Sequence, residues 1–173
     1  DWIIILAIGR LVSLKRFDAV AKSFIELSRV YQNLHLCVLG AGDDRSWEKT
    51  IREQGLGERF MLMCADDVSP YLHAADLYVS ASATESFGLA NLEALSAGLP
   101  VICTNVGAVQ EVVGKSALLI KGDLSDLISA IQSLLDSDVK RATLSRAALS
   151  HVSSWPTVNV VATRYLDAYG LAY

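Results

Sequence analysis

Two glutamates, Glu85 and Glu93, have seven residues between them and enclose the segment of this chain whose residue types are best suited to chemistry. A small polar stretch leads into Glu85, and Gly88 opens a predicted helix over residues 88–97. The first amides of a helix have no partner within it, and they attract anions and other oxygen-rich groups. Glu93 follows on the same helix, where ribose hydroxyls would suit its carboxylate. The free amide donors would be those of Phe87, Gly88, Leu89 and Ala90.

Two basic residues follow the first predicted strand. Gly9 ends this strand, and Arg10 and Lys15 precede a predicted helix over residues 17–31. Arginine offers phosphate oxygens a fork of donors, and lysine offers a mobile point charge. The alternative is an exposed loop with two solvated cations, and each glutamate taken alone has the same alternative as a surface residue. The combination with the helix start favours a diphosphate site.

Other motifs carry weaker signals. Gly40-Ala41-Gly42 lacks the third glycine of a dinucleotide-binding loop, and no G-x-x-x-x-G-K-[ST] phosphate loop occurs in the sequence. The adjacent acids Asp43-Asp44 and Asp66-Asp67 precede predicted helices, so helix capping is favoured over metal binding. The three histidines have no Cys or His partner at ligand spacing. We therefore expect no metal and no cofactor.

Composition narrows the class of protein. The chain has 173 residues and a formal net charge of −4, with no run of Lys and Arg, so a nucleic-acid partner is not expected. The length suits one domain, and no apolar run reaches the roughly 18 residues that span a bilayer. Cys37, Cys64 and Cys103 lie far apart within or beside apolar runs. We expect all three to be buried core residues in a reducing compartment.

Short apolar strands alternate with helical segments along the chain. The predicted strands cover residues 3–8, 34–39, 59–64, 77–80, 100–104 and 117–120. This alternation predicts a Rossmann-like, three-layer α/β/α fold with about six parallel strands. Ligands of such folds bind beyond the carboxyl ends of the strands. The candidate residues Arg10, Lys15 and Glu85 all follow strands, as this rule requires.

Taken together, these residues resemble the carboxyl-terminal domain of the GT-B-fold, family 4 ("group 1") glycosyltransferases. The resemblance is centred on Glu85-Ser86-Phe87-Gly88 and on residues 92–101, which include the second of the family's two glutamates. Gly9-Arg10-Leu11 and Leu39-Gly40-Ala41-Gly42 match further family positions in the same order. The resemblance implies that residues 1–173 form a nucleotide-sugar-binding domain, one half of a GT-B fold.

The resemblance implies a reaction: transfer of a sugar from a nucleoside-diphosphate sugar to an acceptor, a glycan or a lipid-linked glycan, with retention of anomeric configuration. Arg10 and Lys15 would bind the donor diphosphate, and Glu85 would face the donor sugar; these are the three catalytic candidates. The amides of residues 87–90 would hold sugar and phosphate oxygens. Arg10, Lys15 and these amides would stabilise charge on the leaving phosphate in place of a metal ion.

Two further contacts to the nucleoside are implied. Glu93 would hold the ribose hydroxyls, and the backbone near Leu62 and Met63 would lie against the base. Met63 stands where the family usually has glycine.

The resemblance also implies a partner domain. Family members have an amino-terminal domain that binds the acceptor, and we expect this chain, which begins at Asp1, to be a piece that lacks it. Residues 157–173 would either cross back to that domain or pack on this one. The full-length protein would be cytoplasmic, with attachment to the inner face of the membrane left to the absent domain. The alternative to a transferase is a non-catalytic nucleotide-binding Rossmann-like module.

Overall fold

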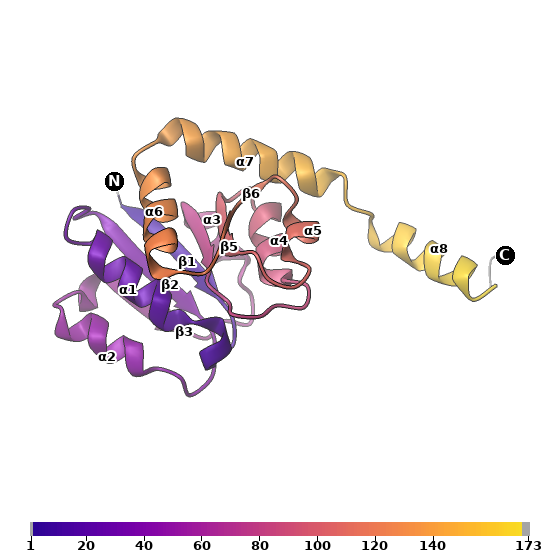
Figure 1. Ribbon diagram of the computed structural model, residues 1–173. Helices are drawn as coiled ribbons and strands as arrows, with labels where there is room; N and C mark the ends of the chain where they lie inside the picture. The colour runs from indigo at the N-terminus through magenta and orange to yellow at the C-terminus, as the bar shows by residue number, and fades with distance from the viewer. Residues whose placement is uncertain (1, 171–173) are drawn as a thin grey trace.

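The computed structural model describes residues 2–170, and a sheet of six parallel strands forms its centre (Figure 1). The strands lie side by side in the order β3-β2-β1-β4-β5-β6. With helices on both faces, this is the Rossmann-like three-layer α/β/α fold that the sequence predicts. The strands are β1 (Ile3–Ile8), β2 (Leu34–Leu39), β3 (Phe60–Met63), β4 (Leu77–Ser80), β5 (Val101–Thr104) and β6 (Ala117–Ile120).

Alternating side chains divide each strand between two hydrophobic clusters. β1 pairs with β2 along its whole length, from Ile3 opposite Leu34 to Ile8 opposite Leu39. Ile5 packs in one cluster, while its neighbour Leu6 packs in the other. Both faces of the sheet are therefore covered, as is usual for parallel strands, whose crossover helices lie on the faces.

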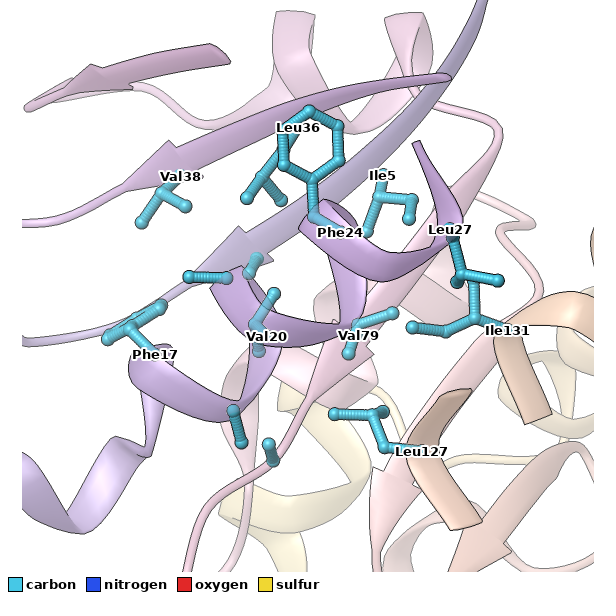
Figure 2. Packing of buried hydrophobic residues seen from close by; sticks show 14 of the residues in the cluster. Ile5, Phe17, Val20, Phe24, Leu27, Leu36, Val38, Val79, Leu127 and Ile131 are labelled. Carbon is cyan, nitrogen blue, oxygen red and sulfur yellow. The ribbon is translucent and has the colours of Figure 1, made fainter. Parts of the chain in front are cut away.

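The first cluster lies beneath α1 (Phe17–Leu27), α2 (Ser46–Glu53) and α6 (Leu124–Leu135). Figure 2 shows Phe24 of α1 lying over Ile5 and Leu36 of the sheet, with Ile131 of α6 beside the same helix. Phe24 and Ile131 are fully buried. Apolar residues at helical spacing on α1 and α6 produce this layer.

The second cluster lies beneath α3 (Ser69–Ala74), α4 (Leu89–Ser96), α5 (Val109–Val113) and α7 (Asp138–Ser153). Leu95 of α4 and Ala148 of α7 are fully buried in it, against strand residues such as Tyr78. This layer fixes α4, whose amino end faces the carboxyl edge of the sheet.

The helix α8 (Val158–Ala168) leaves the body of the molecule, as Figure 1 shows in yellow. None of its residues is buried, and Tyr165 and Tyr169 are 63% and 75% exposed. Packing on this domain, one of the two alternatives for residues 157–173, is wrong for the part through residue 170; residues 171–173 lie outside the described residues.

One predicted helix is too long. Helical spacing extended the first helix to Tyr31, but α1 ends at Leu27, and Val30 is 71% exposed. The amides of Val30 and Tyr31 both bond to the carbonyl of Leu27, which turns the chain toward β2. Tyr31 contributes to packing through this turn, and its hydroxyl donates a hydrogen bond to Asp136 at 2.5 Å.

The two acidic pairs differ in their local roles. The Asp67 carboxylate accepts a hydrogen bond from the Ser69 amide at 2.9 Å, directly before α3, and this bond lowers the pKa of Asp67. By contrast, capping of α2 by Asp43-Asp44 is wrong. Arg45 occupies the N-cap position of α2, and no side chain caps it.

The prediction that all three cysteines are buried is wrong for one of them. Cys37 and Cys103 are buried, whereas Cys64 is exposed. Cys64 follows the last residue of β3, where the chain has already left the sheet. Burial raises the pKa of the Cys37 thiol to about 11 and that of the Cys103 thiol to about 12.

Thiol labelling checks this difference. At pH 8 the folded chain should react with a disulfide reagent such as DTNB at Cys64 alone, because burial keeps Cys37 and Cys103 protonated and inaccessible. Three thiols should react after unfolding in guanidinium chloride. Rapid reaction of two or more thiols in the folded chain would contradict the burial.

Candidate active site at the carboxyl edge of the sheet

The loops that follow β1 and β4 meet at the point where the strand order of the sheet reverses. β1 and β4 are adjacent, with Leu6 opposite Tyr78, although the chain makes two other strands between them. The loop after β1 contains a short 3-10 helix, Ser13–Lys15, and the carbonyl of Leu14 accepts a hydrogen bond from the amide of Ala83 in the loop after β4. This edge of the sheet is the crevice in which ligands of open α/β folds bind.

A cavity of about 310 Å³ occupies this crevice. The size falls at the lower end of the range for small-molecule sites. The sequence predicts seven of the lining residues as site residues; these are Arg10, Lys15, Glu85, Phe87, Gly88, Leu89 and Ala90. Their presence in one cavity brings together two cations, a carboxylate and the start of a helix.

An ion pair crosses the cavity between the two loops. The ammonium of Lys15 donates to the Glu85 carboxylate at 2.5 Å, and their side chains are only 24% and 16% exposed. The sequence predicts separate partners for them, phosphate for Lys15 and sugar for Glu85, and does not anticipate this pair. Arg10 is exposed and pairs with no acid among residues 2–170. Its guanidinium is therefore available to an anion.

The helix α4 directs its first amides into the cavity. Gly88 is its N-cap, with φ 85°, a left-handed conformation that glycine adopts without steric cost. Helical bonding begins with the amides of Asn91 and Leu92, which both bond to the carbonyl of Gly88. The amides before Asn91 thus precede the hydrogen-bond ladder and can act as donors to a ligand.

Three glycines allow the site loops to approach each other backbone to backbone. A Cβ atom on Gly40 would lie 1.9 Å from the carbonyl oxygen of Gly9, and one on Gly42 would lie 2.4 Å from that of Leu11. A Cβ on Gly107, in the loop after β5, would lie 1.7 Å from the carbonyl oxygen of Glu85. No side chain fits at these distances, so these contacts set the positions of the loops that carry the charged residues.

An aromatic contact supports the outer wall of the cavity. The ring of Phe87 meets Trp155 edge to face, with centroids 5.8 Å apart. Trp155 in turn lies beside His151 of α7, whose Nε2 is 2.7 Å from the carbonyl oxygen of Val112 in α5. The position of Phe87 is therefore linked to the segment that joins α7 to α8.

Three predicted site residues lie outside this cavity. Glu93 is exposed on α4, and Leu62 and Met63 are half-buried in β3, which two strands separate from β4. Glu85 and Glu93 are both close enough to Tyr78 to affect its pKa. The pKa of Tyr78 is raised chiefly by burial, and the negative charges of Glu85 and Glu93 raise it further. The structure assigns no ligand to Glu93, Leu62 or Met63, so their roles stay predictions.

Several cavity residues escape sequence reasoning. Tyr78, Ser80 and Asn91 line the cavity but belong to a strand or a helix whose pattern reads as core. Asn91 carried a signal, since it interrupts an apolar run on α4. Gly107 is not a lining residue, and only the fold brings it against the backbone of Glu85.

Residues 2–170 contain no group of three or more His, Cys, Asp or Glu side chains that could hold a metal ion. In the same part of the chain, every helix is too short or too polar to cross a membrane.

Comparison with known proteins decides the family. The family model described as glycosyl transferases group 1 matches residues 3–137. The chain belongs to this family. The O-antigen chain mannosyltransferase B of Escherichia coli is 37% identical to this group 1 glycosyltransferase chain over 139 residues, which are 76% of this chain and 35% of that enzyme.

Solved structures show the same fold. The Anabaena protein HepE, in complex with UDP and glucose, superposes on this chain with a TM-score of 0.87 at 20% sequence identity. The superposition covers 98% of this chain and 48% of the HepE chain. The carboxyl-terminal domain of the group 1 family protein LpcC from Francisella tularensis gives a TM-score of 0.82 at 21% identity, covering 90% and 87%. The group 1 chain thus has the carboxyl-terminal GT-B fold, and it spans about a third of the length of the mannosyltransferase.

The contact at Gly107 of this group 1 chain can be tested by adding one methyl group. Gly107→Ala should lower the free energy of unfolding by the cost of a left-handed alanine, about 1–2 kcal/mol, plus a further 1 kcal/mol or more, roughly, because the Glu85 backbone must move. Urea unfolding measures both costs. Gly55→Ala is the matched control, since Gly55 has φ +74° with nothing within 4 Å of an added Cβ. Equal losses in the two variants would contradict the close approach.

Proposed function

We propose that this chain is the donor-binding domain of a glycosyltransferase that moves a sugar from a nucleoside-diphosphate sugar to an acceptor. One observation carries the proposal. A single cavity at the β1–β4 crevice combines Arg10, Lys15, Glu85 and the amino end of α4. Cations and helix amides suit a diphosphate, and a carboxylate beside them suits sugar hydroxyls. The UDP and glucose bound to HepE, which shares the fold, support the same ligand class.

Each group has a proposed task. Arg10 and Lys15 bind the diphosphate, and the α4 amides hold phosphate and sugar oxygens. Charge develops on the phosphate as its bond to the sugar breaks, so preorganised donors at this point lower the barrier without a metal ion. When the diphosphate enters, Lys15 exchanges part of its contact with Glu85 for phosphate. The freed carboxylate of Glu85 then accepts hydrogen bonds from the sugar.

The remaining parts of the proposal concern the rest of the ligand and of the protein. Glu93 holds the ribose, and the backbone at Leu62 and Met63 contacts the base. The acceptor is a glycan or a lipid-linked glycan, bound by an amino-terminal domain, and transfer retains the anomeric configuration. The protein acts in the cytoplasm or at the inner face of the membrane. The exposed apolar face of α8, with Tyr165 and Leu166, supports contact with a further domain.

Calorimetric titration tests the donor site. The chain should bind one of UDP, GDP and ADP in preference to the others. Arg10→Ala should weaken that binding about 10- to 100-fold, because it removes hydrogen bonds to a charged group. Arg29→Ala is the control. Arg29 is an exposed arginine that pairs with Glu26 beyond the end of α1, so its loss removes the same charge without touching the cavity. Equal affinities in the two variants would refute a phosphate role for Arg10.

A transfer assay separates a transferase from a non-catalytic binding module. The 173-residue chain should release no sugar to an acceptor at a useful rate, because the acceptor-binding groups belong to the amino-terminal domain. The full-length protein should transfer sugar, and Glu85→Gln should reduce its kcat by about 100-fold or more. Radiolabelled donor and product chromatography measure both. Turnover by the short chain alone, or a full-length protein that binds donor without turnover, would contradict the proposal.

A further inference from the structure

Asn91 is a polar residue buried at the edge of the donor cavity. It is the third residue of α4, between Ala90 and Leu92, and it is only 2% exposed. Its neighbours on the helix, Ala94 and Leu95, are fully buried in the apolar cluster beneath α4. Asn91 nevertheless lines the cavity that holds Lys15 and Glu85. It is therefore a buried amide with one side open to the ligand space.

The carboxamide of Asn91 has no partner within the described part of the chain. Its backbone amide bonds to the Gly88 carbonyl, but its side chain makes no hydrogen bond with any of residues 2–170. Among residues 2–170 the fully enclosed polar side-chain atoms without a partner belong to Ser28 and His35, so the amide atoms of Asn91 are not sealed off and open to the cavity. A residue that is otherwise buried finds hydrogen-bond partners for its polar atoms only through that opening. An unpaired amide at the wall of a cavity is a group prepared for a ligand.

The position of the amide relates it to Glu85. A point one Cβ bond from Gly88 lies 2.8 Å from Nδ2 of Asn91 and 3.4 Å from Cγ of Glu85. Both side chains thus approach the same face of Gly88, where an added Cβ would lie. Only a glycine leaves room there, and a ligand group that reaches Glu85 over Gly88 also comes within reach of Asn91. Arg10 and Lys15 occupy the other wall, on the loop after β1.

The chemistry of an amide selects among the parts of a nucleotide sugar. A carboxamide offers both donors and an acceptor, and so does a hydroxyl group, whereas an ionised phosphate only accepts. The cations of the cavity already suit the phosphates. We propose that Asn91 binds the transferred sugar by hydrogen bonding to one of its hydroxyl groups, and so helps to determine which sugar is accepted. This inference rests on the proposed function, since it assigns one more contact within the same cavity.

The test compares affinity for a nucleotide with and without its sugar. Wild-type chain and the variant Asn91→Leu, which keeps a similar volume, are titrated by calorimetry with UDP, UDP-glucose, UDP-N-acetylglucosamine, GDP and GDP-mannose. The readout is the ratio of the dissociation constants for the nucleotide sugar and its free nucleotide. Asn91→Leu should raise this ratio about 10-fold for the preferred donor, as expected for one lost hydrogen bond, and should change affinity for the free nucleotide less than about twofold.

Two further variants keep the result decisive. Asn91→Asp retains the shape of the side chain and an acceptor for a hydroxyl, so it should keep the ratio within about threefold of wild type. Its negative charge can weaken the binding of nucleotide and nucleotide sugar equally without changing this ratio. Ser96→Ala is the control on the same helix, because the Ser96 hydroxyl bonds only to the Leu92 carbonyl away from the cavity. Thermal unfolding of each variant identifies a loss caused by misfolding. If Asn91→Leu does not fold, Asn91→Ala replaces it, and the same raised ratio is expected.

Each outcome has one meaning. A raised ratio with unchanged affinity for the free nucleotide supports sugar binding by Asn91. An equal loss for nucleotide and nucleotide sugar places Asn91 on the phosphates and overturns the inference, as does an unchanged ratio in Asn91→Leu. A wild-type chain that binds none of the five ligands overturns the proposed function itself. If the chain binds these ligands but the substitution of Asn91 does not change the ratio of dissociation constants, the proposed function is retained and only this inference is refuted.

Discussion

The adjacency of β1 and β4 is the constraint on which the site depends. The chain builds β1, β2 and β3 outward in one direction, then returns to place β4 on the other side of β1. The loops that leave β1 and β4 therefore diverge above the sheet and leave a crevice between them. Lys15 comes from one loop and Glu85 from the other, seventy positions apart in sequence, and they meet at 2.5 Å. Neither residue would be near the other in any topology that separated these two strands.

The crevice concentrates opposite charges in a small volume. Lys15 and Glu85 neutralise one another when the cavity holds no ligand, so neither is a lone charge in a partly buried place. The amino end of α4 adds positive partial charge and Arg10 adds a full one, and both face the ligand space. The cavity therefore carries an excess of positive character, although the chain as a whole has a formal net charge of −4. This local balance, and not the net charge, governs what the site attracts.

The fold could be predicted almost completely because it rests on local patterns. Apolar runs that end at glycines locate several of the strands. Because ligands of parallel sheets bind beyond the carboxyl ends of the strands, Arg10, Lys15 and Glu85 are expected at that edge of the sheet. The failures have physical causes as well. Helical spacing cannot show that the chain turns after Leu27, so the helix predicted over residues 17–31 ends early and leaves Val30 exposed. Apolar neighbours cannot show that Cys64 has already left the sheet.

The details of the site could be predicted less well, because they depend on distances between loops. The Lys15–Glu85 pair and the closeness of Gly107 to Glu85 are products of the folded backbone. Asn91 was visible as a polar interruption, but its lack of a partner was not. Glu93, Leu62 and Met63 lie outside the cavity, so the roles predicted for them require a ligand that extends beyond it.

The contacts of Gly40, Gly42 and Gly107 involve backbone atoms of the partner loops. Such contacts do not depend on which side chains surround them. A chain with this fold can exchange much of its core and surface in the course of evolution and still hold its charged residues at the same spacing, provided that these three positions keep no side chain. The geometry of the site can thus outlast the sequence around it, and new specificities can arise in the cavity walls without rebuilding the frame.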